Sequence, residues 1–235
     1  RTWVRRVLAA LGLLAVLQVL PVWAPLLRLE YDLLSSLTAP VRPDAGVLVV
    51  GLDEPSLMAL NQAPPLPRRL HAQLVDTLAA AGTAALGIDL LLGTPQSPAD
   101  DAALARALQG TMPVVLASAE VAVQSSQVAE YRQTVAPIFP DVRYGSVAVD
   151  VDDDGVIRRA PVRGDALWQA LAQSAGRKFT PPPAGALLRY YAPEVPLPYV
   201  HYTQALNPAG MLPPGALQGQ LVLLGQNTPV DDVDQ

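Results

Sequence analysis

The sequence contains no cysteine, only two histidines and little charge, and these shortages exclude several kinds of site. Without cysteine, the 235 residues form no disulfide, Fe–S cluster, thiolate zinc site or cysteine nucleophile. Two histidines, His71 and His201, are too few for a site built on a histidine cluster. Charged residues make up 16% of the chain and the net charge is −5, so no broad basic surface exists and nucleic acid is not expected as a partner.

Nucleotide-binding and nucleophile motifs are also missing. The glycine-containing stretch 82–87 lacks both the dinucleotide and the phosphate-loop patterns, and the chain has no G-x-S-x-G elbow. We therefore expect no cofactor in this part of the protein.

The longest hydrophobic run predicts a transmembrane helix near the N-terminus. Residues 7–27 contain no charge, and the chain as a whole has 51% hydrophobic residues and a mean hydropathy of +0.27, which is high for a soluble globule. A helix of this length spans about 31 Å, close to one hydrocarbon core. Arg1, Arg5 and Arg6 precede it, which favours a cytoplasmic N-terminus and places the remainder outside the cytoplasm.

Two alternatives remain open for this run. A cleaved signal peptide would be cut after Ala24, but Pro25 directly after the cut disfavours processing. A buried core helix is the other alternative, although the run is hydrophobic on all sides. The chain begins with Arg and shows no stop signal at its end, so we expect the natural chain to continue.

The predicted organisation has three parts. Residues 1–28 form a cytoplasmic start and the transmembrane helix, and 29–43 form a juxtamembrane segment with helical leucine spacing. Residues 44–235 form one extracytoplasmic domain, since this length is sufficient for a single sizeable core.

The pattern within 44–235 predicts an α/β fold. Short apolar runs predict buried strands, and amphipathic stretches between them predict helices. The expected strands are 46–52, 84–92, 113–118, 187–191 and 220–224, and the expected helices are 68–81, 98–109, 165–175 and a short one near 202–206. A hairpin is expected between 144–150 and 156–162, around an Asp-Gly turn. We predict a mostly parallel central sheet with helices on both faces.

Acidic residues at strand ends are the first candidate ligand-binding residues. Asp53 and Glu54 follow the first predicted strand, and Asp89 lies near the end of the second. Ligands bind beyond the carboxyl ends of strands in open α/β sheets, so Asp53 and Asp89 are expected to face one crevice. The alternative is that these carboxylates serve as structural hydrogen-bond acceptors.

Arg68 and His71 are the other candidate ligand-binding residues. They begin a predicted helix, where they could meet an anion or a carboxylate. Alternatively, Arg68 pairs with one of the three acids above and closes the edge of the core. His201, beside Tyr199 and Tyr202, is predicted to serve packing and not catalysis.

A weak metal candidate lies in the Asp-Gly turn. Asp150, Asp152 and Asp154 match the start of a D-x-D-x-D-G calcium loop. The twelfth position is Pro161, where such a loop has a bidentate glutamate. A solvated turn is the alternative.

Several short motifs follow one another at characteristic spacing. They are LDEPSL at 52–57, PRRLH at 67–71, AG at 81–82 before GID at 87–89, DD at 100–101 with LA at 104–105, GSV at 145–147 before DDDGVIRR at 152–159, LRYY at 188–191 and GQLVLLG at 219–225. Together they resemble the CHASE2 family of extracytoplasmic sensor domains over nearly all of 44–235. One departure is Gly51-Leu52, where an isoleucine or valine is commoner.

The resemblance implies a receptor in the bacterial inner membrane. Such a receptor has an N-terminal membrane helix, a periplasmic or extracellular sensor, a C-terminal membrane region and a cytoplasmic output such as a nucleotide cyclase, histidine kinase or Ser/Thr kinase. A homodimer is expected because cyclases and histidine kinases act as pairs, and the stimulus is an unidentified small molecule or protein. The alternatives are an extracytoplasmic α/β hydrolase that uses the carboxylates as acid and base, and a structural dimerisation module.

Overall fold

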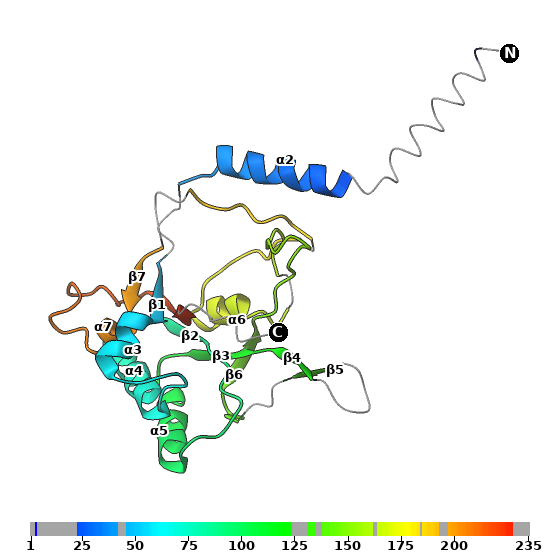
Figure 1. Ribbon diagram of the computed structural model, residues 1–235. Helices are drawn as coiled ribbons and strands as arrows, with labels where there is room; N and C mark the ends of the chain where they lie inside the picture. Colours follow the sequence, from blue (N-terminus) through cyan, green and yellow to red (C-terminus); the bar gives the residue numbers. More distant parts are fainter. Residues whose placement is uncertain are drawn as a thin grey trace. The chain divides into compact units, whose positions relative to one another are not determined.

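The computed structural model describes most of the chain after residue 22 (Figure 1). The described residues are Trp3, 23–41, 46–123, 131–134, 138–161, 164–183, 185–192 and 197–227. They fall into two compact units, one of Arg1–Pro43 with Arg189–Val195 and the other of Asp44–Leu188 with Pro196–Gln235.

The first unit contains helix α2, Trp23–Leu37. The predicted helical spacing of leucines is confirmed, and the helix begins before them, at Trp23. After the helix, the Arg189 guanidinium donates to the Thr38 carbonyl at 3.2 Å and the Ala192 N–H donates to the Pro40 carbonyl at 3.0 Å. These two bonds join the returning segment to the end of the helix.

The predicted transmembrane segment lies largely outside the described residues, because 7–22 are not among them. Within the described part of the chain, no helix has both the length and the apolar character needed to cross a membrane.

The second unit is built on a six-stranded parallel sheet with the order β6-β3-β2-β8-β1-β7. The strands are β1 (Val47–Asp53), β2 (Ala85–Asp89), β3 (Val114–Ser118), β6 (Arg143–Ser146), β7 (Tyr199–His201) and β8 (Leu221–Asn227). All of the pairings within this sheet are parallel, so the predicted parallel arrangement is confirmed. The last strand, β8, lies between the first two.

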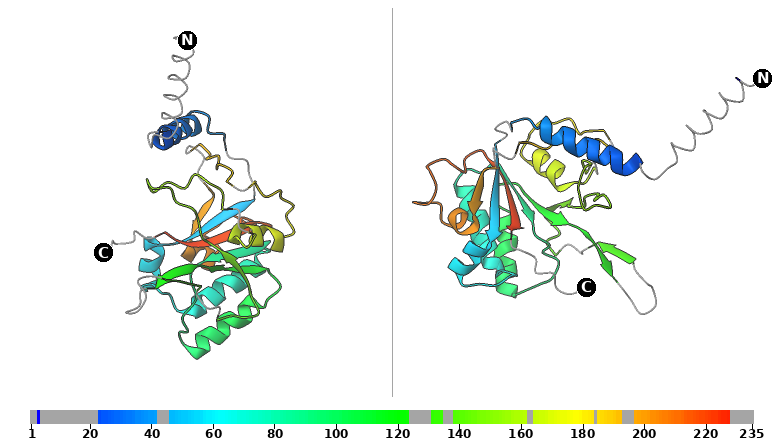
Figure 2. Two further views of the ribbon diagram at one scale, coloured as in Figure 1. Left: turned by 90° about the vertical axis from the view of Figure 1, so that its right-hand side faces the viewer. Right: turned by 45° about the horizontal axis from the view of Figure 1, so that its top comes forward.

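Helices cover both faces of the sheet, as predicted (Figures 1 and 2). On one face, α4 (Arg68–Ala80), α5 (Pro98–Leu108) and α7 (Tyr202–Leu206) bury the larger apolar core. On the other face, α6 (Leu167–Ser174) packs chiefly on β2, β3 and β6, around Val115. Each fully buried leucine or valine contributes about 1.5–3 kcal/mol, so the larger core supplies most of the stabilisation.

The predicted hairpin around the Asp-Gly turn is wrong, although the turn itself forms. Gly155 has φ +81 and its N–H donates to the Asp152 carbonyl at 2.8 Å. The first arm contains β6, which pairs with β3 on one side. On the other side of β6, the Ser146 N–H donates to the Asp165 carbonyl. The second arm hydrogen-bonds to residues 186–188 and forms a single antiparallel bridge with them. The strand expected over 187–191 is therefore reduced to this bridge.

Four elements were not predicted as such. Helix α3 (Glu54–Leu60) follows β1 directly, β7 forms one edge of the sheet, and β4 (Glu120–Val123) pairs with β5 (Tyr131–Thr134) as an antiparallel ribbon. Helix α3 does carry a sequence signal, because an Asp at the N-cap followed by Pro55 in the first turn is typical of a helix start.

Candidate functional site

Asp53 lies at the carboxyl end of β1, where it also begins α3. Its Oδ1 accepts hydrogen bonds from the Ser56 backbone N–H at 3.1 Å and from the Ser56 hydroxyl at 2.6 Å. This is the N-cap arrangement, which satisfies a helix N–H that would otherwise lack a partner. Asp53 is 6% exposed, so the carboxylate is held in place on the helix side.

The second carboxylate oxygen of Asp53 is within hydrogen-bonding distance of two side chains from β7. Its Oδ2 lies 2.6 Å from the Tyr199 hydroxyl, which donates to it, and 2.5 Å from His201 Nδ1. The two rings meet edge to face, with centroids 5.6 Å apart. Asp53 therefore joins the end of a central strand to the edge strand of the sheet.

Gly51 makes this contact possible. A Cβ built at Gly51 would lie 1.8 Å from the Tyr199 phenolic oxygen, so the ring crosses the backbone of β1 at the one position without a side chain. The glycine at position 51 thus has a structural reason. A β-branched residue there would displace Tyr199.

Asp53 carries a negative charge in the folded protein. Burial by itself raises its pKa, but the hydrogen bonds from Ser56, Tyr199 and His201 together outweigh burial and lower the pKa to about 2. Burial and the bond to Asp53 also raise the pKa of Tyr199. An ionised carboxylate favours a proton on Nδ1 of His201, whose side chain is 42% exposed.

Asp89 ends β2 on the same face of the sheet as Asp53. The register pairs Asp53 with Asn227 and Asp89 with Gly225, and residues two apart on a strand point the same way. Strand β8 separates the two carboxylates. The Asp89 side chain is exposed to solvent. The protein around it still removes part of the water near its carboxyl group, and this desolvation raises its pKa.

Glu54 is separate from this arrangement. It is the first residue of α3 and exposed, and it borders a shallow hollow with Leu57, Met58 and Asn61. A ligand-binding role for Glu54 and for Asp89 stays a prediction.

Arg68 has a different acidic partner from those expected. It is 2% exposed, its Nη1 lies 2.6 Å from Asp101 Oδ1, its Nη2 donates to the Thr94 carbonyl, and the guanidinium lies 5.5 Å from the centre of the Phe139 ring. The alternative pairing with Asp53, Glu54 or Asp89 is wrong. Helices α4 and α5 pack together, and this packing places Asp101, in the first turn of α5, beside Arg68.

His71 lies in the larger core and not beside Asp53. It is 3% exposed, and its Nδ1 lies 3.1 Å from the Tyr202 hydroxyl. Burial and the positive charge of Arg68 lower the pKa of His71 to about 4, so it is neutral at physiological pH. The structure therefore brings Asp53 together with Tyr199 and His201, while Arg68 and His71 belong to a separate buried cluster.

Strand β7 contributes more to the site than its sequence predicts. His201 was expected to serve packing, but it contacts Asp53, and Tyr199 was not singled out. The available signal is the spacing Tyr199-x-His201, because residues two apart on a strand share a face.

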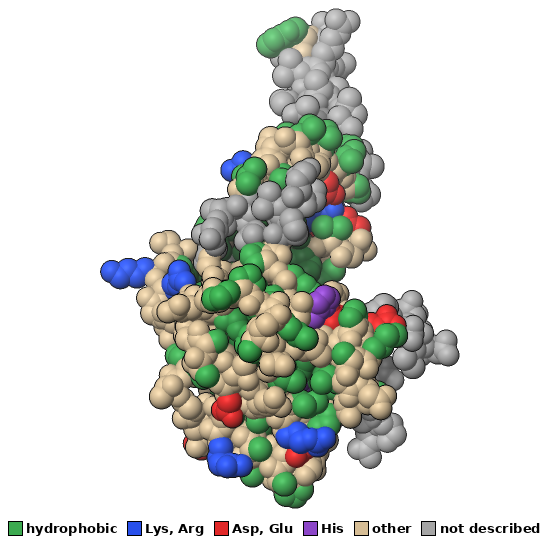
Figure 3. Space-filling view, turned by 90° about the vertical axis from the view of Figure 1, so that its left-hand side faces the viewer, with side chains coloured by type: hydrophobic (Ala, Val, Ile, Leu, Met, Phe, Trp, Pro, Cys, Tyr) green, Lys and Arg blue, Asp and Glu red, His purple; other side chains and the backbone are tan. Residues whose placement is uncertain are grey.

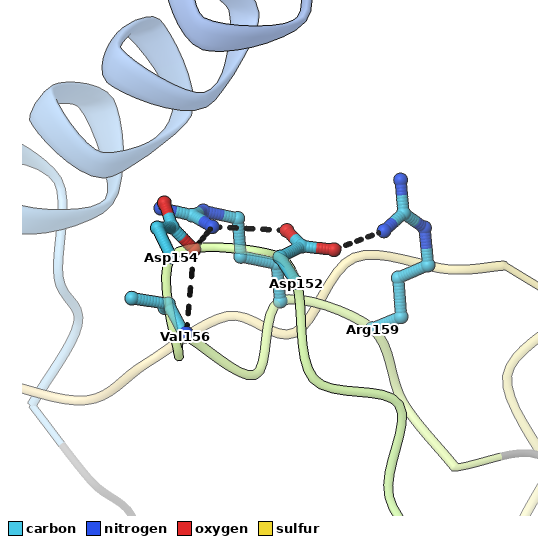
Figure 4. Close-up of polar contacts among 5 residues, drawn as sticks. Asp152, Asp154, Val156 and Arg159 are labelled. Atoms are coloured by element: carbon cyan, nitrogen blue, oxygen red, sulfur yellow. Dashed lines mark hydrogen bonds and ion pairs between the residues drawn. The ribbon is translucent and has the colours of Figure 1, made fainter.

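Two arginines bind the acidic turn (Figure 4). Arg158 binds both oxygens of Asp154, each at 2.8 Å, and one oxygen of Asp152 at 2.9 Å, while Arg159 binds the other oxygen of Asp152 at 2.8 Å. In the part of the chain that is described, no group of three or more His, Cys, Asp or Glu residues is arranged to hold a metal ion. A calcium site at Asp150, Asp152 and Asp154 stays a prediction.

Comparison with known families identifies the class of this domain. The model of the CHASE2 domain family matches residues 8–232, and the chain therefore belongs to that family. CHASE2 is a family of extracellular sensor domains. Searches of the curated proteins and of the solved structures found no match.

Proposed function

We propose that the chain is the extracytoplasmic signal-input domain of a bacterial transmembrane receptor and controls a cytoplasmic nucleotide cyclase, histidine kinase or Ser/Thr kinase. Its membership of a sensor family supports this proposal, as does the uncharged run at 7–27, which would anchor it in the inner membrane. The receptor acts as a homodimer, since cyclases and histidine kinases work in pairs.

The Asp53–Tyr199–His201 cluster is the observation that carries the proposal. One carboxylate ties together the end of β1, the start of α3 and the edge strand β7, and β7 leads directly into α7. Tyr199 and His201 are partly exposed, so a ligand can reach them. A ligand that binds one arrangement of this cluster better than another shifts the population between them, and the attached helices move with it.

A hydrolase is less well supported by the same geometry. The Asp53–His201 pair supplies a base, and such a site also needs a nucleophile or a metal. The described hydroxyls that contact the pair, those of Ser56 and Tyr199, both donate to Asp53 and not to His201. The arrangement therefore suits binding better than bond cleavage.

Output activity tests the proposal in the full-length receptor. Asp53→Asn and Tyr199→Phe are expected to change the output, or its response to the bacterium's growth medium, at unchanged protein abundance in the membrane. Asp76→Asn, on the exposed side of α4, is the matched control for loss of one carboxylate. Wild-type output from both site variants would contradict the proposal.

The absence of cysteine allows a direct test of topology. Met58 is 69% exposed, and Met58→Cys should react with a membrane-impermeant maleimide in cells whose outer membrane alone is permeabilised. Thr2→Cys should react only after the inner membrane is broken. The opposite labelling pattern would place the domain in the cytoplasm. Disulfide cross-linking between copies carrying a single introduced cysteine tests the homodimer.

A further inference from the structure

An open hollow lies beside the Asp53 cluster, on the face of the sheet that α6 covers elsewhere. It has a volume of about 340 Å³, within the range of small-molecule sites. Its lining comes from β1, β7, β8 and the residues next to them: Val49, Gly51, Leu197, Tyr199, Gly225, Gln226 and Asn227. All of these residues belong to the second unit, so the hollow is formed within one compact body.

Gly225 forms part of the floor of the hollow, and neither its backbone conformation nor a neighbouring atom requires a glycine there. It lies inside β8, its φ is outside the positive range that favours glycine, and a Cβ built on it meets no described atom within 4 Å. Glycine weakens a strand interior, where it often marks the close approach of a ligand or of another backbone. Gly51 differs, because Tyr199 fills its space.

The walls combine apolar and amide side chains, and two carboxylates lie next to lining residues. Val49, Leu197 and the Tyr199 ring supply the apolar part, and the Asn227 side chain hydrogen-bonds to the Tyr199 hydroxyl. Asp53 lies behind Tyr199, and Asp89 is the register neighbour of Gly225 on β2. No lysine or arginine lines the hollow in the described part of the chain.

Figure 3 shows one face of the protein in space-filling form. A histidine side chain reaches the surface on the face shown there, with hydrophobic side chains around it and acidic side chains nearby. An apolar floor and an aromatic wall with carboxylates at the margin are the features that attract an organic ammonium group, through charge and through contact with the aromatic face.

We infer that this hollow binds a small organic cation, with its apolar part over Gly225 and against Tyr199 and its ammonium group toward Asp89. The inference rests on the proposed function and specifies the chemical class of the stimulus. The shape accounts for Gly225, because any side chain there would occupy the volume that the apolar part needs.

Calorimetric titration of the purified full-length protein tests the charge preference. The probes are phenethylammonium, its isosteric anion 3-phenylpropionate, and butylammonium, which lacks the ring. Phenethylammonium is expected to bind, butylammonium to bind more weakly, and 3-phenylpropionate not to bind. Equal binding of the anion, or no binding of either ammonium probe at about 10 mM, where even millimolar affinity is detected, would overturn the inference.

Two variants locate the bound probe. Gly225→Val should abolish phenethylammonium binding, and unchanged circular dichroism and melting temperature would show that the domain is still folded. Gly225→Ala is the smaller change if the valine variant does not fold. Asp89→Asn should weaken binding about fivefold at low salt, as expected for one surface charge, while Asp76→Asn leaves it unchanged. Binding that survives filling of the hollow overturns the assignment.

The two proposals fail separately. If phenethylammonium binds but neither it nor the Asp53 variant alters output, the hollow stands and the signalling role is wrong. If the Asp53 and Tyr199 variants alter output but no ammonium probe binds, the signalling role stands and the ligand class is wrong.

Discussion

The Tyr199 ring lies across the backbone of Gly51, with its hydroxyl on the carboxylate of Asp53 two residues further along the same strand. Gly51→Ala places a methyl group 1.8 Å from the phenolic oxygen. We expect this variant to lose about 1–3 kcal/mol in the free energy of unfolding, measured by urea titration, because the ring must leave its place and release Asp53.

A double-mutant cycle separates this clash from a general effect of alanine. In a Tyr199→Ala background, Gly51→Ala should cost little, since the space is then empty. Gly225→Ala is the matched control on the neighbouring strand, and it should stabilise the protein by about 0.4–1 kcal/mol. An equal loss from Gly51→Ala in both backgrounds would show that the Tyr199 ring is not the cause.

The low pKa of Asp53 predicts a loss of stability in acid. The carboxyl has a pKa of 3.8 without these contacts and about 2 in the fold, so its contribution is complete above about pH 4 and disappears as the pH falls toward 2. The contribution is about 2 kcal/mol at 1.4 kcal/mol per pKa unit. Unfolding titrations between pH 2 and 5 should show this loss in the wild type and not in Asp53→Asn.

His71 predicts a second acid transition at higher pH. Its pKa falls from 6.5 to about 4 on folding, so the unfolded chain takes up the proton first. Stability is therefore complete above about pH 6.5 and falls by about 3 kcal/mol as the pH drops to 4. His71→Gln keeps a partner for the Tyr202 hydroxyl and should flatten the profile between pH 4 and 6.5. A profile identical to that of the wild type would assign the transition to another group.

Two adjacent arginines offer a matched comparison of buried and exposed ion pairs. Arg68 is 2% exposed and pairs with Asp101, while Arg69 is 60% exposed and pairs with Asp100. Arg68→Ala leaves a charge without its partner and should cost about 3–5 kcal/mol, whereas Arg69→Ala should cost less than about 1 kcal/mol. Chemical denaturation of both variants measures the difference, and similar losses would mean that the burial of Arg68 adds nothing.

The central elements were predictable because each carries its own local signal. The apolar runs of β1, β2, β3 and β8 predict buried strands, and α4 ends as expected at a glycine of positive φ, Gly82. The Asp53 site was only half predictable. The acid stands at the end of an obvious strand, but its partners come from a three-residue strand about 150 positions later, and no local pattern encodes that pairing.

The errors have the same origin. The Asp-Gly turn forms as its residues predict, yet the two arms that flank it pair with other segments and not with each other. Local propensity is therefore sufficient for the turn, whereas the strand pairing depends on long-range contacts. Arg68 likewise met an acid of α5 because two helices pack side by side, which spacing along the chain does not reveal.

The position of β8 has a consequence for how the protein is made. This strand, the last in the described chain, supplies the hydrogen-bonding partner on one side of both β1 and β2, so neither can be completed while the ribosome is still producing residues before 221. During that interval two apolar strand edges lie open, and they are vulnerable to mispairing until β8 is available to pair with them.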